Sequence, residues 1–176
     1  MSGPPGAGKT TLAYALADAL GWPAVCRDAI KERMAATEAD AGRIAHDELD
    51  LRTLEAFFGR IGELVRSGTD LVAEAAFQDR LWRPNLEPLI AGGLTRLRVI
   101  RCVVDPEVAR LRIIRRADEE PSRAAHADDA FLRRIARGER PIESWVPIAL
   151  DVPSLIVDTT KDWSPPLDRI TGFARA

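Results

Sequence analysis

A glycine-rich segment near the start of the chain restricts the possible folds more than any other feature. It matches the pattern Gly-x-x-x-x-Gly-Lys-Ser/Thr in full, with Gly3, Pro4, Pro5, Gly6, Ala7, Gly8, Lys9 and Thr10. Glycines tolerate the positive φ angles that let successive backbone N–H groups point inward around one anion. A helix is predicted to follow at once, because Leu12, Leu16 and Leu20 recur every four residues. The segment is therefore predicted to be a phosphate-binding loop at a helix N-terminus.

Two side chains at the end of this loop have predicted roles in binding a nucleotide. Lys9 would place a positive charge on the β- and γ-phosphates, and the Thr10 hydroxyl would ligate Mg²⁺. The alternative is a glycine-rich turn that precedes a helix by chance. A chance match is disfavoured because lysine is scarce in this chain. Of the 25 basic residues, only Lys9, Lys31 and Lys161 are lysines.

Predicted strands and helices alternate along the rest of the chain. Short apolar runs typical of buried strands lie at residues 24–26, 71–76, 97–104 and 155–157. Helical patterns lie at residues 28–34, 45–67, 81–90, 106–117, 131–137 and 166–173. Strands separated by helices imply an α/β fold with a mainly parallel sheet that helices cover on both faces, a three-layer sandwich. No repeat or long linker divides residues 1–176, so a single domain is predicted.

The position of the loop in the chain is unusual. A phosphate-binding loop normally follows a central strand, yet only Met1 and Ser2 precede it here. We therefore expect the sheet to lack its first strand or to hold only a stub of it. A start codon placed too late, or a truncated chain, would account for this.

Composition and charge narrow the class of protein. The 25 basic and 27 acidic residues give a net charge of −2, which disfavours a protein that coats nucleic acid. Cys26 and Cys102 lie in separate apolar runs, so we expect free thiols and a cytoplasmic location. No run approaches the ~20 apolar residues that a membrane-spanning helix needs. His46 and His126 are the only histidines, so zinc chemistry is disfavoured. Separately, we expect the protein to be a monomer.

Two large classes of nucleotide-binding protein are also disfavoured. The segment Thr160-Lys161-Asp162-Trp163 departs at its last position from the Asn/Thr-Lys-x-Asp pattern of guanine-selective GTPases. A ring-forming ATPase needs a second domain, for which 176 residues leave no room. The length matches a small phosphotransferase.

Three segments, in order, resemble the small P-loop kinases of the AAA-family ATPase type. They are the loop with its helix start (residues 3–13), Cys26-Arg27-Asp28-Ala29-Ile30-Lys31, and Val72-Ala73-Glu74-Ala75-Ala76-Phe77. That group includes relatives of chloramphenicol phosphotransferase, zeta toxins and the kinase domain of polynucleotide kinase. The resemblance implies a P-loop NTPase fold, with ATP and Mg²⁺ as ligands and Thr11 as a further residue of the nucleotide site.

The resemblance also implies that Asp28 accepts the proton of the hydroxyl group that is phosphorylated. A carboxylate at the carboxyl end of a strand faces the crevice where ligands bind in open α/β sheets. The alternative is that Asp28 only caps the helix that follows.

Glu74 interrupts an apolar run, where a carboxylate is costly unless it meets a metal, water or a cation. It resembles the acidic residue of a Walker-B strand, which holds Mg²⁺ through water. The alternatives are a contact with the substrate and a strand-end glutamate that reaches solvent.

Arg112 and Arg116 lie four residues apart and share a face of the predicted helix, with Arg115 beside them and Arg123 farther on. The resemblance implies a closing lid at about residues 112–130, whose arginines neutralise charge on the transferred phosphoryl group, and Arg116 also contacts the nucleotide. A solvated basic face that pairs with nearby acidic residues is the alternative. Asp158, after the last strand, would line the adenine pocket or form a plain turn.

Together these features favour an ATP-dependent phosphotransferase that transfers the γ-phosphoryl group to a hydroxyl group of a small molecule, which the sequence does not specify. One alternative is an ATP-binding regulatory or toxin-type protein without this activity. Another is a nucleic-acid 5′-hydroxyl kinase, which the acidic balance disfavours.

Overall fold

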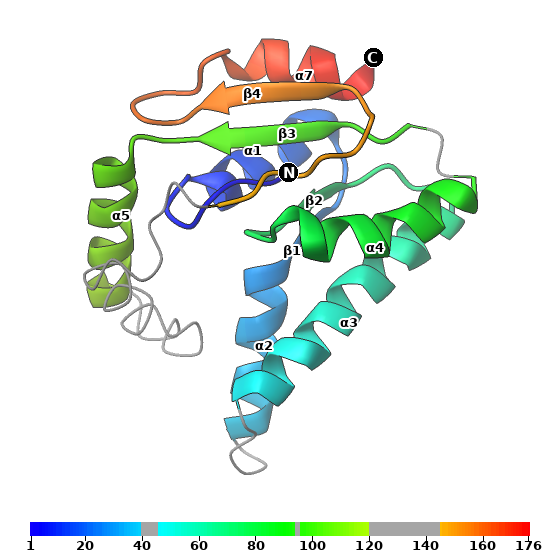
Figure 1. Ribbon diagram of the computed structural model, residues 1–176, viewed down its shortest axis with the longest axis horizontal. Helices are drawn as coiled ribbons and strands as arrows, with labels where there is room; N and C mark the ends of the chain where they lie inside the picture. The colour runs from blue at the N-terminus through cyan, green and yellow to red at the C-terminus, as the bar shows by residue number, and fades with distance from the viewer. Residues whose placement is uncertain (40–45, 94–95, 120–144) are drawn as a thin grey trace.

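The computed structural model describes residues 1–39, 46–93, 96–119 and 145–176. Its strands are β1 (Ala24–Cys26), β2 (Val72–Glu74), β3 (Val99–Val103) and β4 (Ser154–Asp158). Its helices are α1 (Lys9–Leu20), α2 (Arg27–Ala39), α3 (His46–Arg66), α4 (Asp79–Ala91), α5 (Pro106–Glu119) and α7 (Leu167–Arg175) (Figure 1). All of these were predicted within a few residues, and the helix predicted at 131–137 lies outside the described residues.

The four strands form two parallel pairs, β1 with β2 and β3 with β4. Met1 and Ser2 lie between the pairs. On one side the Met1 amino group donates to the carbonyl oxygen of Ala73 at 2.5 Å. On the other side the Ser2 N–H donates to the carbonyl oxygen of Ile100 at 2.9 Å, and the Cys102 N–H donates to the carbonyl oxygen of Ser2 at 2.8 Å. Ser2 forms a parallel bridge with Arg101, so these two residues lie at the position of a central strand between the pairs.

Helices cover both faces of this parallel arrangement. One core joins α1 and α7 to the strands, with Leu12, Leu16 and Ile170 all buried. The other core joins α3 and α4 to the opposite face, with Phe57 and Trp82 buried. Neighbouring strand residues contribute to opposite cores, as a pleated strand requires. The three-layer α/β sandwich is therefore confirmed.

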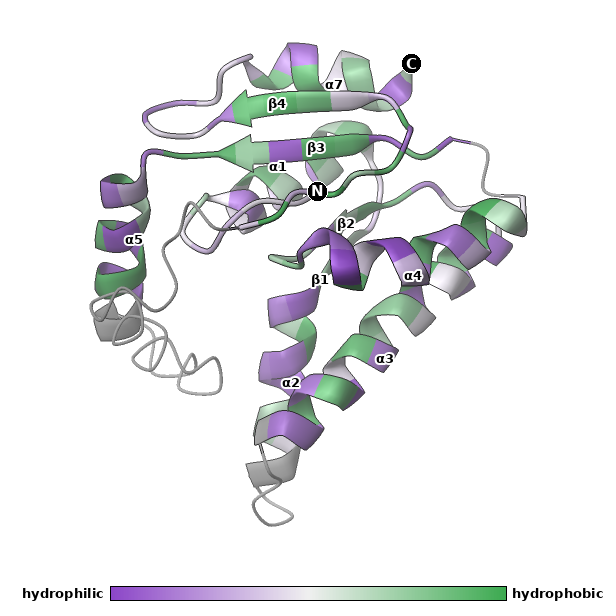
Figure 2. Cartoon of the chain, viewed as in Figure 1, coloured by the Kyte–Doolittle hydropathy of each residue, from purple (hydrophilic) through white to green (hydrophobic). Residues whose placement is uncertain are grey.

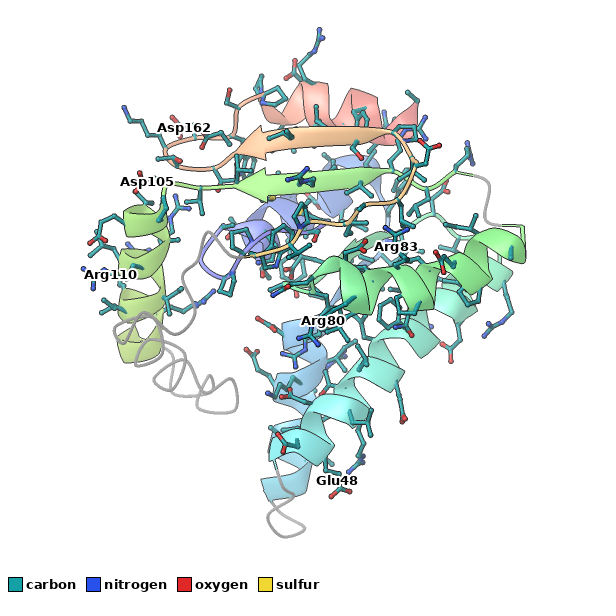
Figure 3. The ribbon with its side chains drawn as sticks, viewed as in Figure 1. Glu48, Arg80, Arg83, Asp105, Arg110 and Asp162 are labelled. Atoms are coloured by element: carbon teal, nitrogen blue, oxygen red, sulfur yellow. The ribbon has the colours of Figure 1, made fainter. Side chains whose placement is uncertain are left out.

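The distribution of polar side chains agrees with this layering. Figure 2 shows that β4 is mainly hydrophobic, whereas the helices alternate hydrophilic and hydrophobic residues along their length. Charged side chains such as Glu48 on α3 and Arg110 on α5 project away from the ribbon (Figure 3). No helix in the described ranges is both long and apolar enough to cross a membrane.

An aromatic cluster forms the centre of the second core. The rings of Phe57, Phe58, Phe77 and Trp82 lie with their centroids between 5.0 and 6.0 Å apart, mostly edge to face. Such pairs stabilise beyond the apolar area they bury. Burial of Trp82 and Leu86 also explains how α4 accommodates Pro84 and Pro88, each of which removes a backbone hydrogen bond.

We predict that Phe57→Ala lowers the free energy of unfolding by about 3–5 kcal/mol, because the fully buried ring leaves a cavity in this cluster. Leu51→Ala on the same helix is the matched control, since Leu51 is 56% exposed, and it should cost about 0.5 kcal/mol or less. Urea denaturation of both variants measures the difference. Equal losses would contradict the assignment of Phe57 to the core.

Candidate active site

The glycine-rich loop has the backbone conformation that anion binding requires. Gly6 and Gly8 have φ angles of 78° and 63°. A Cβ atom at Gly6 would also lie 2.5 Å from the carbonyl oxygen of Ala109, so a side chain there would collide with α5. Gly8 precedes α1 without a side-chain cap, which leaves the N–H groups of the first helical turn available to a phosphate.

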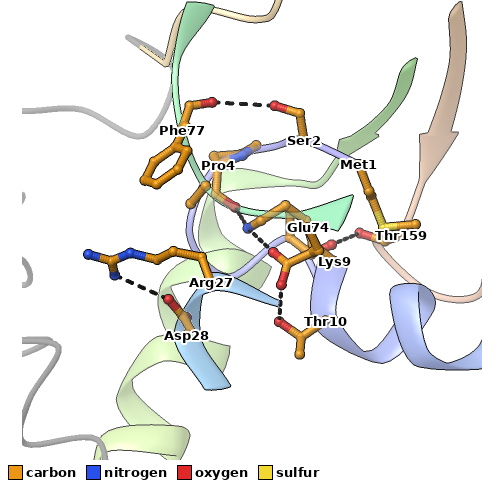
Figure 4. A network of polar contacts seen from close by, with 12 residues as sticks. Met1, Ser2, Pro4, Lys9, Thr10, Arg27, Asp28, Glu74, Phe77 and Thr159 are labelled. Atoms are coloured by element: carbon orange, nitrogen blue, oxygen red, sulfur yellow. Dashed lines mark hydrogen bonds and ion pairs between the residues drawn. The ribbon is translucent and has the colours of Figure 1, made fainter. Parts of the chain in front are cut away.

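The end of the loop meets the carboxyl end of β2 (Figure 4). The Thr10 hydroxyl donates to Oε2 of Glu74 at 3.0 Å, and Nζ of Lys9 lies 3.9 Å from Oε1 of the same carboxylate. Lys9 also donates to the carbonyl oxygen of Pro4 at 2.9 Å. Lys9 and Glu74 are only 7% and 3% exposed. The structure thus brings together three residues predicted separately from the sequence.

This arrangement suits a magnesium ion. The Thr10 hydroxyl and the Glu74 carboxylate supply the hard oxygen ligands that Mg²⁺ prefers. Among the described residues no group of three or more His, Cys, Asp or Glu side chains could hold a metal by itself. Mg²⁺ in nucleotide sites takes only one or two protein ligands, with phosphates and water completing the shell, so the residues present fit the ion.

Asp28 lies in the first turn of α2, which begins at Arg27, so it does not precede the helix as a cap would. Its Oδ1 accepts a hydrogen bond from Arg27 at 3.3 Å, and its side chain is 33% exposed. Cys26 and Glu74 are register partners in the β1–β2 pair. Asp28 therefore follows the same sheet edge as Glu74, where a bound substrate would lie.

A buried lysine beside Asp28 was not predicted from the sequence. Lys31 is 2% exposed and its Nζ lies 2.7 Å from Oδ1 of Asp50, which also accepts from Arg27. Burial acts to raise the pKa of Asp50, but the Lys31 hydrogen bond and the two cations outweigh it and lower that pKa. The Arg27 guanidinium also lies over the Phe77 ring, 5.9 Å from its centroid. These contacts fix the start of α2 against α3.

Arg112 contacts the loop. Its guanidinium donates to the carbonyl oxygens of Thr159 at 2.7 Å, Thr160 at 3.2 Å and Gly6 at 3.4 Å. Arg116 lies one turn farther along α5 and Arg115 is exposed. Arg123 and residues 120–130 of the predicted lid lie outside the described residues.

The turn after β4 is also fastened to the loop. Oγ1 of Thr159 lies 2.9 Å from the carbonyl oxygen of Ala7 and 3.0 Å from that of Val103. The exposed Asp158 accepts from the Thr160 N–H at 2.8 Å, and this hydrogen bond lowers the pKa of the Asp158 carboxyl. Asp158 is the last residue of β4, and its carboxylate holds the start of the turn that follows. Its predicted contact with adenine stays a prediction.

The sequence and its comparisons now identify the family. The family model of the AAA domain matches residues 1–141, which is most of the chain. The chain belongs to the AAA domain family. No curated protein matches it significantly.

Several solved structures share the fold of this AAA domain. A "putative kinase" from Chloroflexus aurantiacus J-10-fl is 26% identical with a TM-score of 0.80, and the match covers 99% of this chain and 95% of that one. A sugar kinase from Janibacter sp. HTCC2649 is 18% identical with a TM-score of 0.61, covering 98% and 88%. A gluconokinase from Sinorhizobium meliloti 1021 is 21% identical with a TM-score of 0.55, covering 98% and 86%. The last two show the fold alone.

These comparisons confirm the resemblance to small P-loop proteins of the AAA type and the P-loop NTPase fold. They do not test the roles of individual residues.

We predict that Thr159→Val lowers the free energy of unfolding by about 1–3 kcal/mol, because the carbonyl oxygen of Ala7 loses its buried donor. Thr37→Val is the matched control, since its hydroxyl bonds a helix carbonyl at an exposed site. Chemical denaturation measures the loss. If both substitutions had the same effect, Thr159 would not hold the loop.

Proposed function

We propose that this AAA domain is an ATP-dependent phosphotransferase that transfers the γ-phosphoryl group of ATP to a hydroxyl group of a small molecule. The observation that carries the proposal is the contact of Lys9 and Thr10 with the buried Glu74 at the N-terminus of α1. Phosphates, a cation and a carboxylate meet in this way in P-loop phosphotransferases. The fold shared with proteins described as kinases supports the same function.

In this mechanism the loop amides and Lys9 bind the β- and γ-phosphates. Thr10 and Glu74 would hold Mg²⁺, which neutralises phosphate charge when it is bound. Asp28 orients the acceptor hydroxyl and takes its proton. The hydroxyl oxygen forms a bond to the γ-phosphorus while the bond from that phosphorus to the β,γ-bridging oxygen breaks, so ADP leaves. Arg112 and Arg116 stabilise the charge that develops on the transferred group.

Two alternatives make different predictions. A binding protein without turnover would retain ATP but form no product. A nucleic-acid 5′-hydroxyl kinase would bind its acceptor with an affinity that falls steeply as salt rises, and the net charge of −2 disfavours it. Because a sugar kinase and a gluconokinase share the fold, sugars and sugar acids are the first acceptors to assay with labelled ATP.

We predict that Asp28→Asn binds ATP like the unmodified protein but transfers phosphate about 10²–10⁴-fold more slowly, because the proton acceptor is lost. Lys9→Ala should instead weaken ATP binding, since it removes the charge on the phosphates. Asp47→Asn, an exposed position at the start of α3, is the control and should change neither property. Full transfer activity in Asp28→Asn would remove it as the base.

We predict that Glu74→Gln raises the Mg²⁺ concentration for half-maximal activity about tenfold or more. The reason is that a neutral amide oxygen binds Mg²⁺, or the water bound to it, less strongly than a carboxylate does. Glu87→Gln is the control, since its side chain is 56% exposed on α4. A magnesium titration of both variants, with circular dichroism as a check of folding, measures the effect. An unchanged midpoint in Glu74→Gln would exclude the carboxylate from the metal site.

A further inference from the structure

A second carboxylate lies beside Asp28, and one guanidinium holds both. Nη1 of Arg27 donates to Oδ1 of Asp28 at 3.3 Å, a contact drawn in Figure 4. Nη2 of the same guanidinium donates to Oδ1 of Asp50 on α3 at 2.5 Å. The guanidinium is a rigid planar fork, and it also lies over the Phe77 ring. The two carboxylates are therefore held at a fixed spacing, one on α2 and one on α3.

The contacts of Asp50 use only one of its two oxygens. Nζ of the buried Lys31 lies 2.7 Å from Oδ1, the same oxygen that accepts from Arg27. Within the described ranges no hydrogen bond ends on Oδ2. The Asp50 side chain is 41% exposed, although Lys31 is only 2% exposed. Because its two cations lower the pKa of Asp50, Oδ2 belongs to an ionised carboxylate and is open to a hydrogen-bond donor.

The charges of this group decide which kind of donor fits. The contacts join two cations to two carboxylates, so the formal charges cancel; the four residues are Arg27, Lys31, Asp28 and Asp50. An anionic group of a substrate would meet two carboxylates here, and an ammonium group would meet two cations. A neutral hydroxyl meets neither repulsion. Its hydrogen bond to an ionised carboxylate is also of the stronger kind.

We propose that Asp50 binds a second hydroxyl group of the acceptor while Asp28 takes the proton of the hydroxyl that is phosphorylated. The acceptor is then a polyhydroxy compound, and Asp50 is a specificity-determining residue. This inference rests on the proposed function, because it takes Asp28 as the base. No bond forms or breaks at Asp50, which only accepts a hydrogen bond. Arg27 and Lys31 hold its carboxylate in place.

The test compares polyols with alcohols that carry a single hydroxyl group. Glycerol, D-glucitol, D-ribose and D-glucose form the first set, and ethanol, 1-butanol and cyclohexanol form the second. Transfer is followed with labelled ATP, and binding is measured by calorimetry with a non-hydrolysable ATP analogue. At least one polyol should be bound and phosphorylated. Its kcat/KM should exceed that of every single-hydroxyl alcohol by about tenfold or more, the expected effect of one hydrogen bond to a charged group.

Substitution of Asp50 should change the binding of this polyol rather than the rate of transfer. Asp50→Ala should raise its KM about tenfold or more and leave kcat and the KM for ATP within roughly threefold, because a contact made equally in the ground and transition states is lost. A merely structural role, exerted through Arg27 on Asp28, would lower kcat instead. The double variant Asp50→Ala/Lys31→Met leaves no buried lysine without its carboxylate, so it should fold and show the same rise.

Monodeoxy analogues of the same polyol complete the test. One of them should have a KM as high as the polyol has in Asp50→Ala, and the variant should raise that KM no further. Glu63→Gln is the matched control, since this α3 carboxylate pairs with Arg60 but is 61% exposed, and it should change nothing.

The possible failures are distinguishable. Equal transfer to single-hydroxyl alcohols, an unchanged KM in both Asp50 variants, or additive effects of variant and analogue would overturn the proposal and leave the phosphotransferase function standing. Polyol binding that depends on Asp50 without any transfer would contradict the proposed function alone. Neither binding nor transfer of any polyol at millimolar concentration would overturn the substrate class.

Discussion

The contact of Lys9 and Thr10 with the carboxylate of Glu74 is the interaction on which the site depends. A carboxylate that is 3% exposed is strongly destabilising without a cation and hydrogen bonds, and the loop supplies both. The contact therefore fixes the phosphate loop against the end of β2. Thr159 ties the same loop to the turn after β4, and Arg112 ties it to α5. The loop is held in place from three sides.

The parts of the structure that could be predicted from the sequence are those determined by residues close together in the chain. The glycine pattern of the loop, the four-residue spacing of Leu12, Leu16 and Leu20, and the apolar runs each produce structure within a few residues of themselves. Glu74 was also recognised, because a carboxylate in an apolar run needs a special partner. Its partners in the structure, Lys9 and Thr10, had been identified independently from the loop pattern.

The parts that the sequence did not predict depend on residues far apart in the chain. The Lys31–Asp50 pair joins α2 to α3. The Thr159 hydroxyl contacts the carbonyl oxygen of Ala7, although the two residues are 152 positions apart in the sequence. No local pattern marks such pairs, because an exposed lysine and a buried one look alike in a sequence. Arg112 shows the same limit: helical spacing placed it on one face with Arg116, but only the fold shows that its guanidinium bonds the carbonyl oxygens of Thr159, Thr160 and Gly6. Its action on a transferred phosphoryl group stays a prediction.

The most direct test of the nucleotide site is calorimetric titration of the folded chain with ATP and with AMP, each in the presence of Mg²⁺. Lys9, Thr10 and Glu74 lie where the β- and γ-phosphates and their metal would bind. ATP should therefore bind with measurable heat and AMP far more weakly. Absence of heat with ATP, or equal affinity for AMP, would contradict a site built around the triphosphate.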